Sequence, residues 1–335
     1  MPFVLAKEHP RLWSLNSGVA MVITDLHGDW KTYQYLRDRF TDLHAKRKAD
    51  CLIFTGDMIH SESEKFPDQS IEMVLDILNL QSIFGEAIIY LCGNHELPHI
   101  YGFGLAKGQI EYTPSFENQM CQNNVRDAII ELFLALPFYI RTVAGVSIAH
   151  AGATSLISNA RSAMKLFNWS HQAILSEAHT RLEIGDRTGM RRAFARLSQS
   201  ESYDDLARRY LSVKGEDDPR YDDLLLGFFT TSNSEFDLLY SALSTNCEQE
   251  FGMEAYSKAL TGLLQYLSLE YSTQRILVSG HMSVQNGYQV IAKNQLRFAS
   301  GSHAKPLETG QYLLFDTSQP VEIMENLLAG LFSIY

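Results

Sequence analysis

Five short polar clusters contain the residues best suited to chemistry, and each directly follows a short apolar run. The clusters are Thr24-Asp25-Leu26-His27-Gly28, Thr55-Gly56-Asp57, Gly93-Asn94-His95-Glu96, His150-Ala151-Gly152 and Gly280-His281. Carboxylate, amide and imidazole ligands together suit Mn, Fe, Zn or Co, whereas all-oxygen sites suit Mg and Ca. Each cluster alone fits a turn or a structural histidine, but five in succession favour one transition-metal site.

The apolar runs that precede these clusters are predicted to be buried strands. They cover residues 19–24, 51–55, 87–91, 145–149 and 275–279, and helical patterns at 30–44, 69–83 and 125–136 lie between the first four. This alternation predicts an α/β fold. Ligands of open α/β sheets bind in the crevice at the carboxyl ends of the strands, so the fold is expected to bring the five clusters together.

The second half of the chain follows a different pattern. Residues 155–270 carry apolar side chains at helical spacing with almost no strand pattern, which predicts a helical insertion or cap within a single domain spanning 1–335. After it, 287–292 and 296–300 predict a β-hairpin, and 311–316 and 321–324 predict two further strands.

Composition limits the classes of function. The chain has 335 residues, 45% of them apolar and 20% charged, which is typical of a folded protein with a sizeable core. Its formal net charge of −11 would repel nucleic acids and anionic membranes, so neither is an expected partner. The four cysteines form no Cys-x-x-Cys pair, and there is no signal peptide or membrane-spanning apolar run. These features predict a soluble, cytoplasmic protein and leave its oligomeric state open.

The order of the clusters resembles that of the phosphoprotein phosphatase branch of the calcineurin-like metallophosphoesterases. The family pattern runs Gly-Asp-x-His-Gly, Gly-Asp-x-x-Asp-Arg-Gly, Gly-Asn-His-Glu, His-Gly/Ala-Gly and Gly/Ala-His, and the similarity extends over residues 19–317. The stretch 287–298 resembles the family's closing hairpin, followed by a substrate-side loop at 299–302. The resemblance implies a metallophosphoesterase fold, in which two facing mixed β-sheets are flanked by helices.

The resemblance also implies roles for individual residues. Asp25 and His27 would bind one metal, Asp57 would bridge two metals, and Asn94, His150 and His281 would complete the second. His95 would be the catalytic acid that protonates the leaving oxygen, and not a ligand. Two divalent transition-metal ions are expected, with manganese as the first choice and iron or zinc as alternatives. Such a pair activates a bridging hydroxide and clamps the attacking and leaving oxygens at phosphorus.

Two departures from the family pattern affect residues that would bind the phosphate group of the substrate. The family's Asp-Arg-Gly is replaced by His60-Ser61-Glu62, and Cys92 stands where protein-phosphatase members commonly have another arginine. Neither serine nor cysteine replaces a bidentate arginine. We therefore consider Arg187, in a turn-rich break of the insertion, and His60 as substrate-binding residues. His60, Glu62 or Glu64 would alternatively orient His95, and a third explanation is a weak enzyme or an unusual substrate.

These observations predict a metal-dependent phosphatase acting on phosphomonoesters, with a phosphoprotein or a small phosphoester as its substrate. One alternative is hydrolysis of a nucleotide or dinucleoside polyphosphate. Another is a binding module that holds a phosphorylated partner with little turnover, favoured by the missing arginines and disfavoured by His95 and the intact ligands. His303, just beyond the closing hairpin, is expected to be a solvated loop histidine, with a place at the mouth of the site as the alternative.

Overall fold

The computed structural model describes residues 3–62 and 66–335, and the chain divides into two compact units. The first, called the sheet unit below, comprises Met1–Asn94, Leu136–Trp169 and Leu238–Tyr335. The second, called the helical unit, comprises His95–Ala135 and Ser170–Asp237. The stretch predicted as an insertion contains helices from Ala160 to Leu267 among the described residues, and it contributes to both units.

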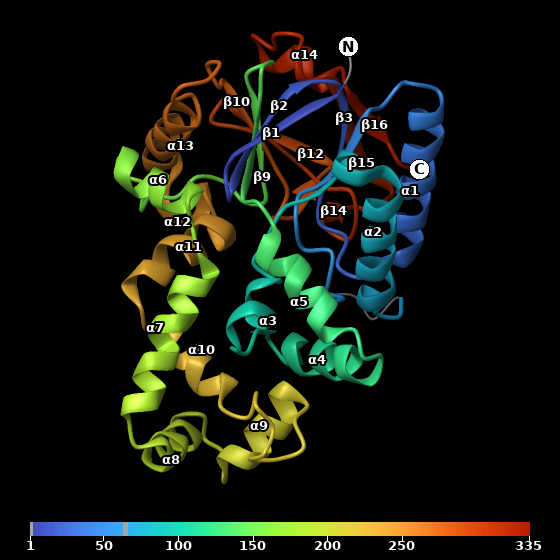
Figure 1. Ribbon diagram of the computed structural model, residues 1–335. Helices are drawn as coiled ribbons and strands as arrows, with labels where there is room; N and C mark the ends of the chain where they lie inside the picture. The colour runs from blue at the N-terminus through green and yellow to red at the C-terminus, as the bar shows by residue number, and fades with distance from the viewer. Residues whose placement is uncertain (1–2, 63–65) are drawn as a thin grey trace. The chain divides into compact units, whose positions relative to one another are not determined.

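Two large mixed β-sheets form the centre of the sheet unit (Figure 1). The first has the strand order β1 (Val4–His9), β2 (Leu12–Ser17), β8 (Tyr139–Thr142), β9 (Val146–Ala149), β10 (Ile276–Ser279), β13 (Gln295–Phe298) and β12 (Tyr288–Ile291). The second has the order β16 (Leu331–Ser333), β15 (Gln311–Asp316), β3 (Val19–Ile23), β4 (Cys51–Phe54) and β5 (Ile88–Tyr90). A short pair, β11 (Val284–Gln285) with β14 (Ala304–Lys305), lies beside them.

The two sheets share one apolar core. Val22 and Ile53 from the second sheet belong to the same buried cluster as Ile148, Val278 and Leu296 from the first. Strands buried on both faces consist of nearly continuous apolar residues, which explains the apolar runs that form β3, β4, β9 and β10 inside the two sheets. The predicted fold of two facing mixed sheets is therefore confirmed.

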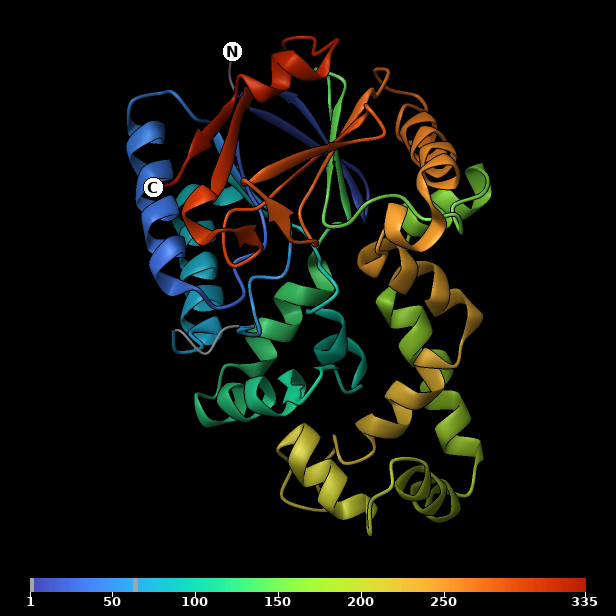
Figure 2. The same ribbon diagram turned by 180° about the vertical axis from the view of Figure 1, so that it is seen from behind.

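Helices cover the outer faces of the two sheets. Figures 1 and 2 show α1 and α2 beside the second sheet, with α6 and α13 on the side of the first. Asp29 caps α1 by accepting a hydrogen bond from the Thr32 backbone N–H, 3.1 Å away. The helices of this unit are α1 (Trp30–Ala45), α2 (Ser70–Phe84), α6 (Ala160–Phe167), α12 (Glu248–Phe251), α13 (Met253–Leu267) and α14 (Met324–Leu328), with short 3₁₀ turns at Gly85–Ala87 and Leu307–Thr309.

The helical unit joins two segments that are distant in the sequence. Its elements are α3 (Leu97–Tyr101), β6 (Ala106–Lys107), β7 (Ile110–Glu111), α4 (Tyr112–Gln122), α5 (Arg126–Ala135), α7 (His171–Ile184), α8 (Arg187–Leu197), α9 (Tyr203–Leu211) and α10 (Asp223–Thr231). The next helix, α11 (Ser234–Ser244), begins in this unit and ends in the sheet unit. The buried core of the helical unit includes Leu182, Tyr203, Leu211 and Leu225.

Some sequence-based assignments need correction. The strand predicted at 321–324 is wrong, because the described chain is non-strand there and α14 begins at Met324. Strands β1, β2 and β8 were not predicted. The charged residues of β1 interrupt its apolar pattern, and it is one of the two edge strands of its sheet, where polar side chains are tolerated.

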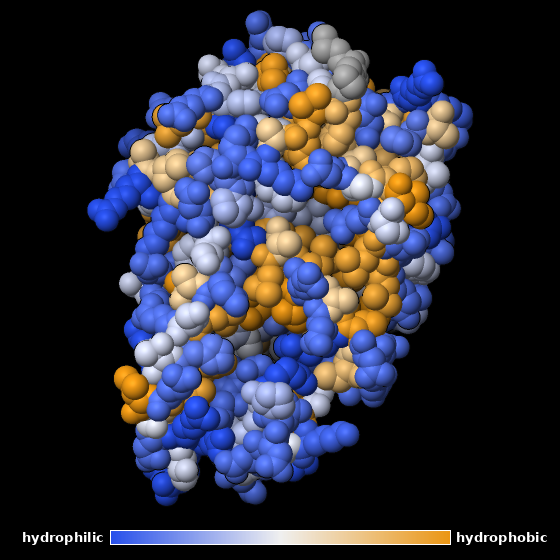
Figure 3. Space-filling view, in the orientation of Figure 1, coloured by the Kyte–Doolittle hydropathy of each residue, from blue (hydrophilic) through white to orange (hydrophobic). Residues whose placement is uncertain are grey.

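The described residues include no helix that is both long enough and apolar enough to cross a membrane. Figure 3 shows one face of the molecule, where hydrophilic residues predominate and hydrophobic residues gather in patches. Single exposed apolar residues such as Ile83 and Ile184 are normal on a folded protein and need no functional explanation.

The helical unit contains a buried ion-pair network centred on Glu117, and we predict that removing this carboxylate destabilises the protein. Glu117 on α4 accepts hydrogen bonds from His99 Nδ1 at 2.8 Å and from Arg126 Nε at 2.9 Å, and Arg220 lies 3.4 Å away. Removing one member of a buried ion pair leaves uncompensated charge, so Glu117→Gln is expected to lower the free energy of unfolding by about 3 kcal/mol at pH 7. Thermal unfolding measures this loss.

The pH dependence and a matched variant test the origin of that loss. Burial alone would raise the pKa of Glu117, but the hydrogen bond and charge of His99, together with Arg126, lower it below the usual range. A lowered pKa stabilises the fold above the pKa of the unfolded chain, so the difference between wild type and Glu117→Gln should shrink as the pH falls below about 4.5. Glu254→Gln, at an exposed pair with Lys258, should change stability by less than about 0.5 kcal/mol. Equal losses in both variants would contradict the prediction.

Candidate metal centre

The carboxyl ends of five strands bring six polar side chains into one region of the sheet unit. β3, β4 and β5 are parallel to one another, and β9 is parallel to β10. Each of these strands ends one to four residues before a side chain expected to bind metal: Asp25 and His27 after β3, Asp57 after β4, Asn94 after β5, His150 after β9 and His281 after β10. All except the half-buried His281 are buried.

The loops are held in unusual backbone conformations. His27, Asp57 and His281 have φ angles of 48°, 52° and 69°, in the left-handed region. Such conformations cost about 1 to 3 kcal/mol per residue and concentrate at functional sites. The His27 backbone N–H donates to the Asp57 carbonyl at 3.1 Å, which ties the first two loops together. Gly56 is required beside them, because a Cβ there would lie 2.6 Å from the Gly93 nitrogen.

Asp57 lies between two groups of ligand atoms. Its Oδ2 atom is 3.4 Å from His150 Nε2 and 3.9 Å from His27 Nε2. Asp57, His150 and His281 offer ligand atoms within 4.8 Å of one another, and Asp25, His27 and His303 form a second such group. The carboxylate of Asp57 therefore adjoins both groups.

The atoms around His150 Nε2 are arranged as ligands of a cation would be. The Nδ1–H of His150 donates to the Thr55 carbonyl at 3.1 Å, which leaves Nε2 with a lone pair. That atom faces Asn94 Oδ1 at 3.0 Å and His281 Nδ1 at 3.1 Å. The single lone pair of Nε2 can accept a hydrogen bond from only one of these two neighbours. A metal ion, in contrast, would bind Nε2, Oδ1 and Nδ1 together. A backbone carbonyl that fixes the tautomer is typical of metal-binding histidines.

Burial disfavours the charged forms of His150 and His281. It lowers the pKa of His150 well below its usual value, with a further contribution from the neighbouring His281. It also lowers the pKa of His281, to about 3, with a further contribution from His303. Burial raises the pKa of Asp25, although the charge of His303 and the backbone N–H of His281 act in the opposite direction. Neutral imidazoles keep the lone pairs that a metal needs.

Close packing around Asp25 gives a direct test of this geometry. The His281 backbone N–H donates to both oxygens of Asp25, at 3.0 and 2.9 Å, and a Cβ at Gly280 would overlap Asp25 Oδ2. Gly280→Ala should therefore displace the Asp25 carboxylate. The expected result is metal affinity reduced by about 10- to 100-fold, the range seen when a residue that orients a ligand is lost. Calorimetric titration of the metal-free protein measures it.

Gly262→Ala is the matched control for Gly280→Ala. Gly262 lies inside α13, where a Cβ would make only an ordinary contact of 3.7 Å with the Tyr266 ring. Alanine is favoured over glycine within a helix by up to about 1 kcal/mol, so this variant should be slightly more stable and bind metal normally. Unchanged metal affinity in Gly280→Ala would show that Asp25 does not need its present position.

Three further residues were predicted to take part in catalysis or substrate binding. His95 is the first residue of the helical unit, directly follows Asn94 in the chain, and packs against Tyr112 with ring centroids 5.2 Å apart. Arg187, at the start of α8 in the helical unit, is half exposed and lies 3.9 Å from Asp222. His60 is buried, and its backbone N–H donates to Ser70 Oγ. The roles predicted for these three residues stay predictions, and Glu64 lies outside the described residues.

One residue near the predicted ligands is less exposed than the preferred sequence-based expectation. His303 was expected to be solvated, but it is only 7% exposed, and its ring lies 4.9 Å from that of His27. Glu62, considered above as a partner of His95, lies 3.4 Å from His303 Nε2. The one sequence signal for His303 was its place just after the closing hairpin.

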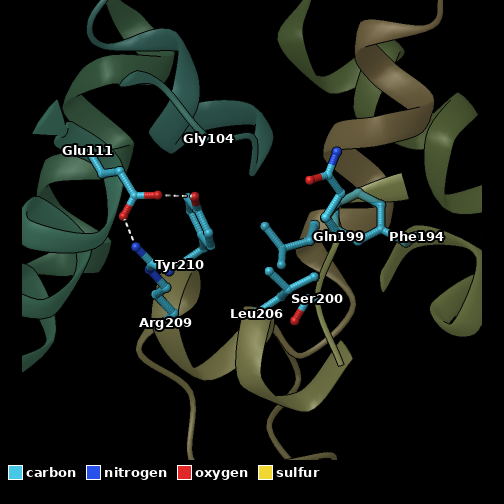
Figure 4. A pocket seen from close by; sticks show the side chains of 10 residues that line it. Gly104, Glu111, Phe194, Gln199, Ser200, Leu206, Arg209 and Tyr210 are labelled. Carbon is cyan, nitrogen blue, oxygen red and sulfur yellow. Dashed lines mark hydrogen bonds and ion pairs between the residues drawn. The ribbon is translucent and has the colours of Figure 1, made fainter. Parts of the chain in front are cut away.

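The helical unit contains a pocket of a different character, with a volume of about 400 Å³. Figure 4 shows Glu111 at its wall, hydrogen-bonded to Tyr210 and paired with Arg209. Phe194 and Leu206 provide apolar lining. The described lining residues include one carboxylate and no imidazole or thiol, so this pocket lacks the metal-binding chemistry of the sheet unit.

The two-sheet α/β fold, with carboxylate and imidazole side chains after its strand ends, is a metallophosphoesterase fold. The profile of the calcineurin-like phosphoesterase family matches residues 19–281, which is most of the chain. The protein therefore belongs to the calcineurin-like phosphoesterase family, and the expectation of a phosphoesterase fold and activity class is confirmed at that level. No curated protein shows a significant sequence match.

The solved structures to which this chain is similar share little sequence with it. A protein serine/threonine phosphatase from Saccharomyces cerevisiae with similarity to human phosphatase PP5 is 14% identical, with 88% of this chain and 72% of that chain covered and a TM-score of 0.46. A cold-active protein-tyrosine phosphatase of a psychrophilic Shewanella is 15% identical, with coverages of 92% and 77% and a TM-score of 0.44. A metallophosphoesterase from Sphaerobacter thermophilus is 10% identical, with coverages of 94% and 93% and a TM-score of 0.34. The family assignment rests on the sequence profile.

Proposed function

We propose that this protein is a metal-dependent phosphomonoester hydrolase of the phosphoprotein phosphatase branch, with a binuclear metal centre. The position of Asp57 carries the proposal. Its carboxylate adjoins His150 on one side and His27 on the other, as a ligand shared by two ions would. Asp25 and His27 hold the first ion, and Asn94, His150 and His281 hold the second. Manganese is the proposed metal, with iron or zinc as alternatives.

The residues of the chain prepare this centre for hydrolysis. Two divalent cations, when bound, supply an activated water and neutralise charge on the phosphoryl group. The hydrogen bond from His27 Nδ1 to the Ile59 carbonyl, 3.1 Å long, leaves Nε2 free of a proton and directed at Asp57. The bond from His150 to the Thr55 carbonyl does the same for the second group. The neutral ligands keep the centre positively charged, so it can attract a phosphate despite the net charge of −11.

His95 is proposed as the group that donates a proton to the leaving oxygen. It directly follows the ligand Asn94 in the chain, is 7% exposed, and packs against Tyr112. A buried, packed imidazole keeps one orientation, which a general acid needs in order to reach a single oxygen. The substrate is proposed to be a phosphorylated protein or a small phosphoester, bound with the help of Arg187 or His60.

The test is hydrolysis by purified, metal-free protein to which Mn²⁺, Fe²⁺, Zn²⁺ or Mg²⁺ is restored. The substrates are an aryl phosphate, phosphoserine, phosphothreonine and phosphotyrosine peptides, adenine nucleotides and a dinucleoside tetraphosphate. We expect metal-dependent release of phosphate from monoesters, fastest with Mn²⁺. Faster cleavage of the nucleotides would instead indicate that the protein is a nucleotide or dinucleoside polyphosphate hydrolase.

A second candidate function is binding of a phosphorylated partner with little turnover. The observation that favours it is at Cys92, where an arginine would grip phosphate: the Cys92 side chain is buried, and its Sγ lies 3.4 Å from the Gly93 carbonyl oxygen. Metal-loaded protein that binds a phosphopeptide and releases no phosphate from any substrate would favour this function over hydrolysis.

A further inference from the structure

The loop that contains His303 is built onto the first metal-binding loop. It connects β13 to β14. The Ser300 backbone N–H donates to Thr24 Oγ1 at 3.0 Å, and the Thr24 backbone N–H donates back to Ser300 Oγ at 3.0 Å. Next to them, a Cβ at Gly301 would lie only 2.8 Å from the Asp25 carbonyl oxygen, so the two loops are in close contact. His303 is therefore fixed beside Asp25.

The orientation of the His303 ring is that of a metal ligand. Its Nε2 atom lies 3.4 Å from Glu62 Oε2, so an Nε2–H donates to that carboxylate and leaves the lone pair on Nδ1. Nδ1 is buried and has no hydrogen-bond partner among the residues that the structure describes. It lies 3.8 Å from Asp25 Oδ1, and its ring lies beside that of His27. Carboxylate, histidine and metal in this order form a common arrangement in metalloproteins.

A purely structural ion pair explains this geometry less well. A protonated His303 that served only to neutralise Asp25 would donate its Nδ1–H to the carboxylate, at 2.7 to 3.2 Å. The observed separation of 3.8 Å is too long for that bond, yet Asp25, His27 and His303 each offer one ligand atom within 4.8 Å of the other two. This spacing leaves room for a cation among the three ligand atoms.

We propose that His303 is an additional ligand of the ion held by Asp25 and His27, and that Glu62 fixes its ring. The proposal rests on the proposed binuclear centre and extends it, because His303 comes from a loop outside the five clusters. It also gives Glu62 a function that does not involve His95.

Metal binding, measured apart from activity, tests the proposal. Metal-free wild type, His303→Ala and Glu62→Gln are titrated with Co²⁺ by calorimetry, and the visible absorption of the bound Co²⁺ is recorded. We expect wild type to bind two ions and His303→Ala to bind one of them at least about 10-fold more weakly. Glu62→Gln should weaken the same ion by about 10- to 100-fold, as loss of a residue that orients a ligand does. His179→Ala, at an exposed histidine of α7, should bind both ions normally.

Three further measurements make the outcome decisive. His281→Ala should weaken the other ion, so the absorption bands lost in His303→Ala and His281→Ala should differ. If His303→Ala does not fold, His303→Asn is titrated in its place, and circular dichroism checks that it is folded. Two ions bound with wild-type affinity and absorption by a folded His303 variant would overturn the inference and leave the binuclear centre intact. A wild-type protein that binds fewer than two ions would instead overturn the proposed function.

Discussion

Replacement of Asp57 by asparagine is expected to reduce metal-dependent hydrolysis by about 10³-fold, the upper end of the effect of removing one preorganised electrostatic group. Asparagine has the same shape but no charge, and Asp57 adjoins both candidate ligand groups, so in the proposed centre both ions would lose their shared anionic ligand. Asparagine also tolerates the left-handed backbone conformation, here at a φ of 52°, so the loop should keep its course. Rates with an aryl phosphate at saturating Mn²⁺ measure the loss.

Thermal stability distinguishes lost metal from a lost fold in Asp57→Asn. An isolated buried carboxylate is costly, so without metal the variant should be at least as stable as wild type. A bound ion raises stability in proportion to the logarithm of its concentration over its dissociation constant. The increase in melting temperature on adding Mn²⁺ should therefore be much smaller in the variant. An equal increase and equal activity in both proteins would show that Asp57 is not a shared ligand.

The strands that lead to the site could be predicted because burial on both faces leaves a simple pattern in the sequence. β3, β4, β5, β9 and β10 all consist of almost uninterrupted apolar residues, and a polar loop follows each. Since parallel strands of one sheet place their carboxyl ends at one edge, the order of the loops was enough to predict that Asp25 and Asp57 lie together. His150 follows β9 of the other sheet, and this rule alone does not place it beside them.

The features that were missed depend on contacts between distant parts of the chain. His303 follows Ser300, Gly301 and Ser302, a sequence typical of a solvated turn. Its burial results from packing of that turn against Thr24 and Asp25, nearly 280 residues earlier. No local pattern in the sequence records such a contact.

The same reason explains why the composition of the helical unit could not be predicted. Helical periodicity identifies helices but not the helices against which they pack. Glu117 bonds to Arg126 on the neighbouring helix and also lies 3.4 Å from Arg220, 103 residues later. The structure therefore groups 95–135 with 170–237, whereas the sequence pattern changed only near residue 155.

Substitution of His95 by asparagine is expected to affect a different step from Asp57→Asn. If His95 protonates the leaving oxygen, its loss should lower kcat by about 10²- to 10⁴-fold for alkyl phosphomonoesters, the usual range for general acid catalysis. A nitrophenolate leaves without a proton, so nitrophenyl phosphate should be affected far less. A plot of log kcat against the pKa of the leaving group should be steeper for His95→Asn than for wild type.

Metal affinity also distinguishes His95 from the residues that are proposed to bind metal. Asn94 contributes its amide oxygen to the group around His150, whereas the next residue, His95, is assigned no ligand role. His95→Asn should therefore take up two Co²⁺ ions with wild-type affinity, while Asn94→Ala should bind at least one ion more weakly. If His95→Asn loses an ion, or if its rates fall equally for alkyl and nitrophenyl esters, then His95 is not a general acid. In that event its position beside Asn94 would serve the metal and not the leaving group.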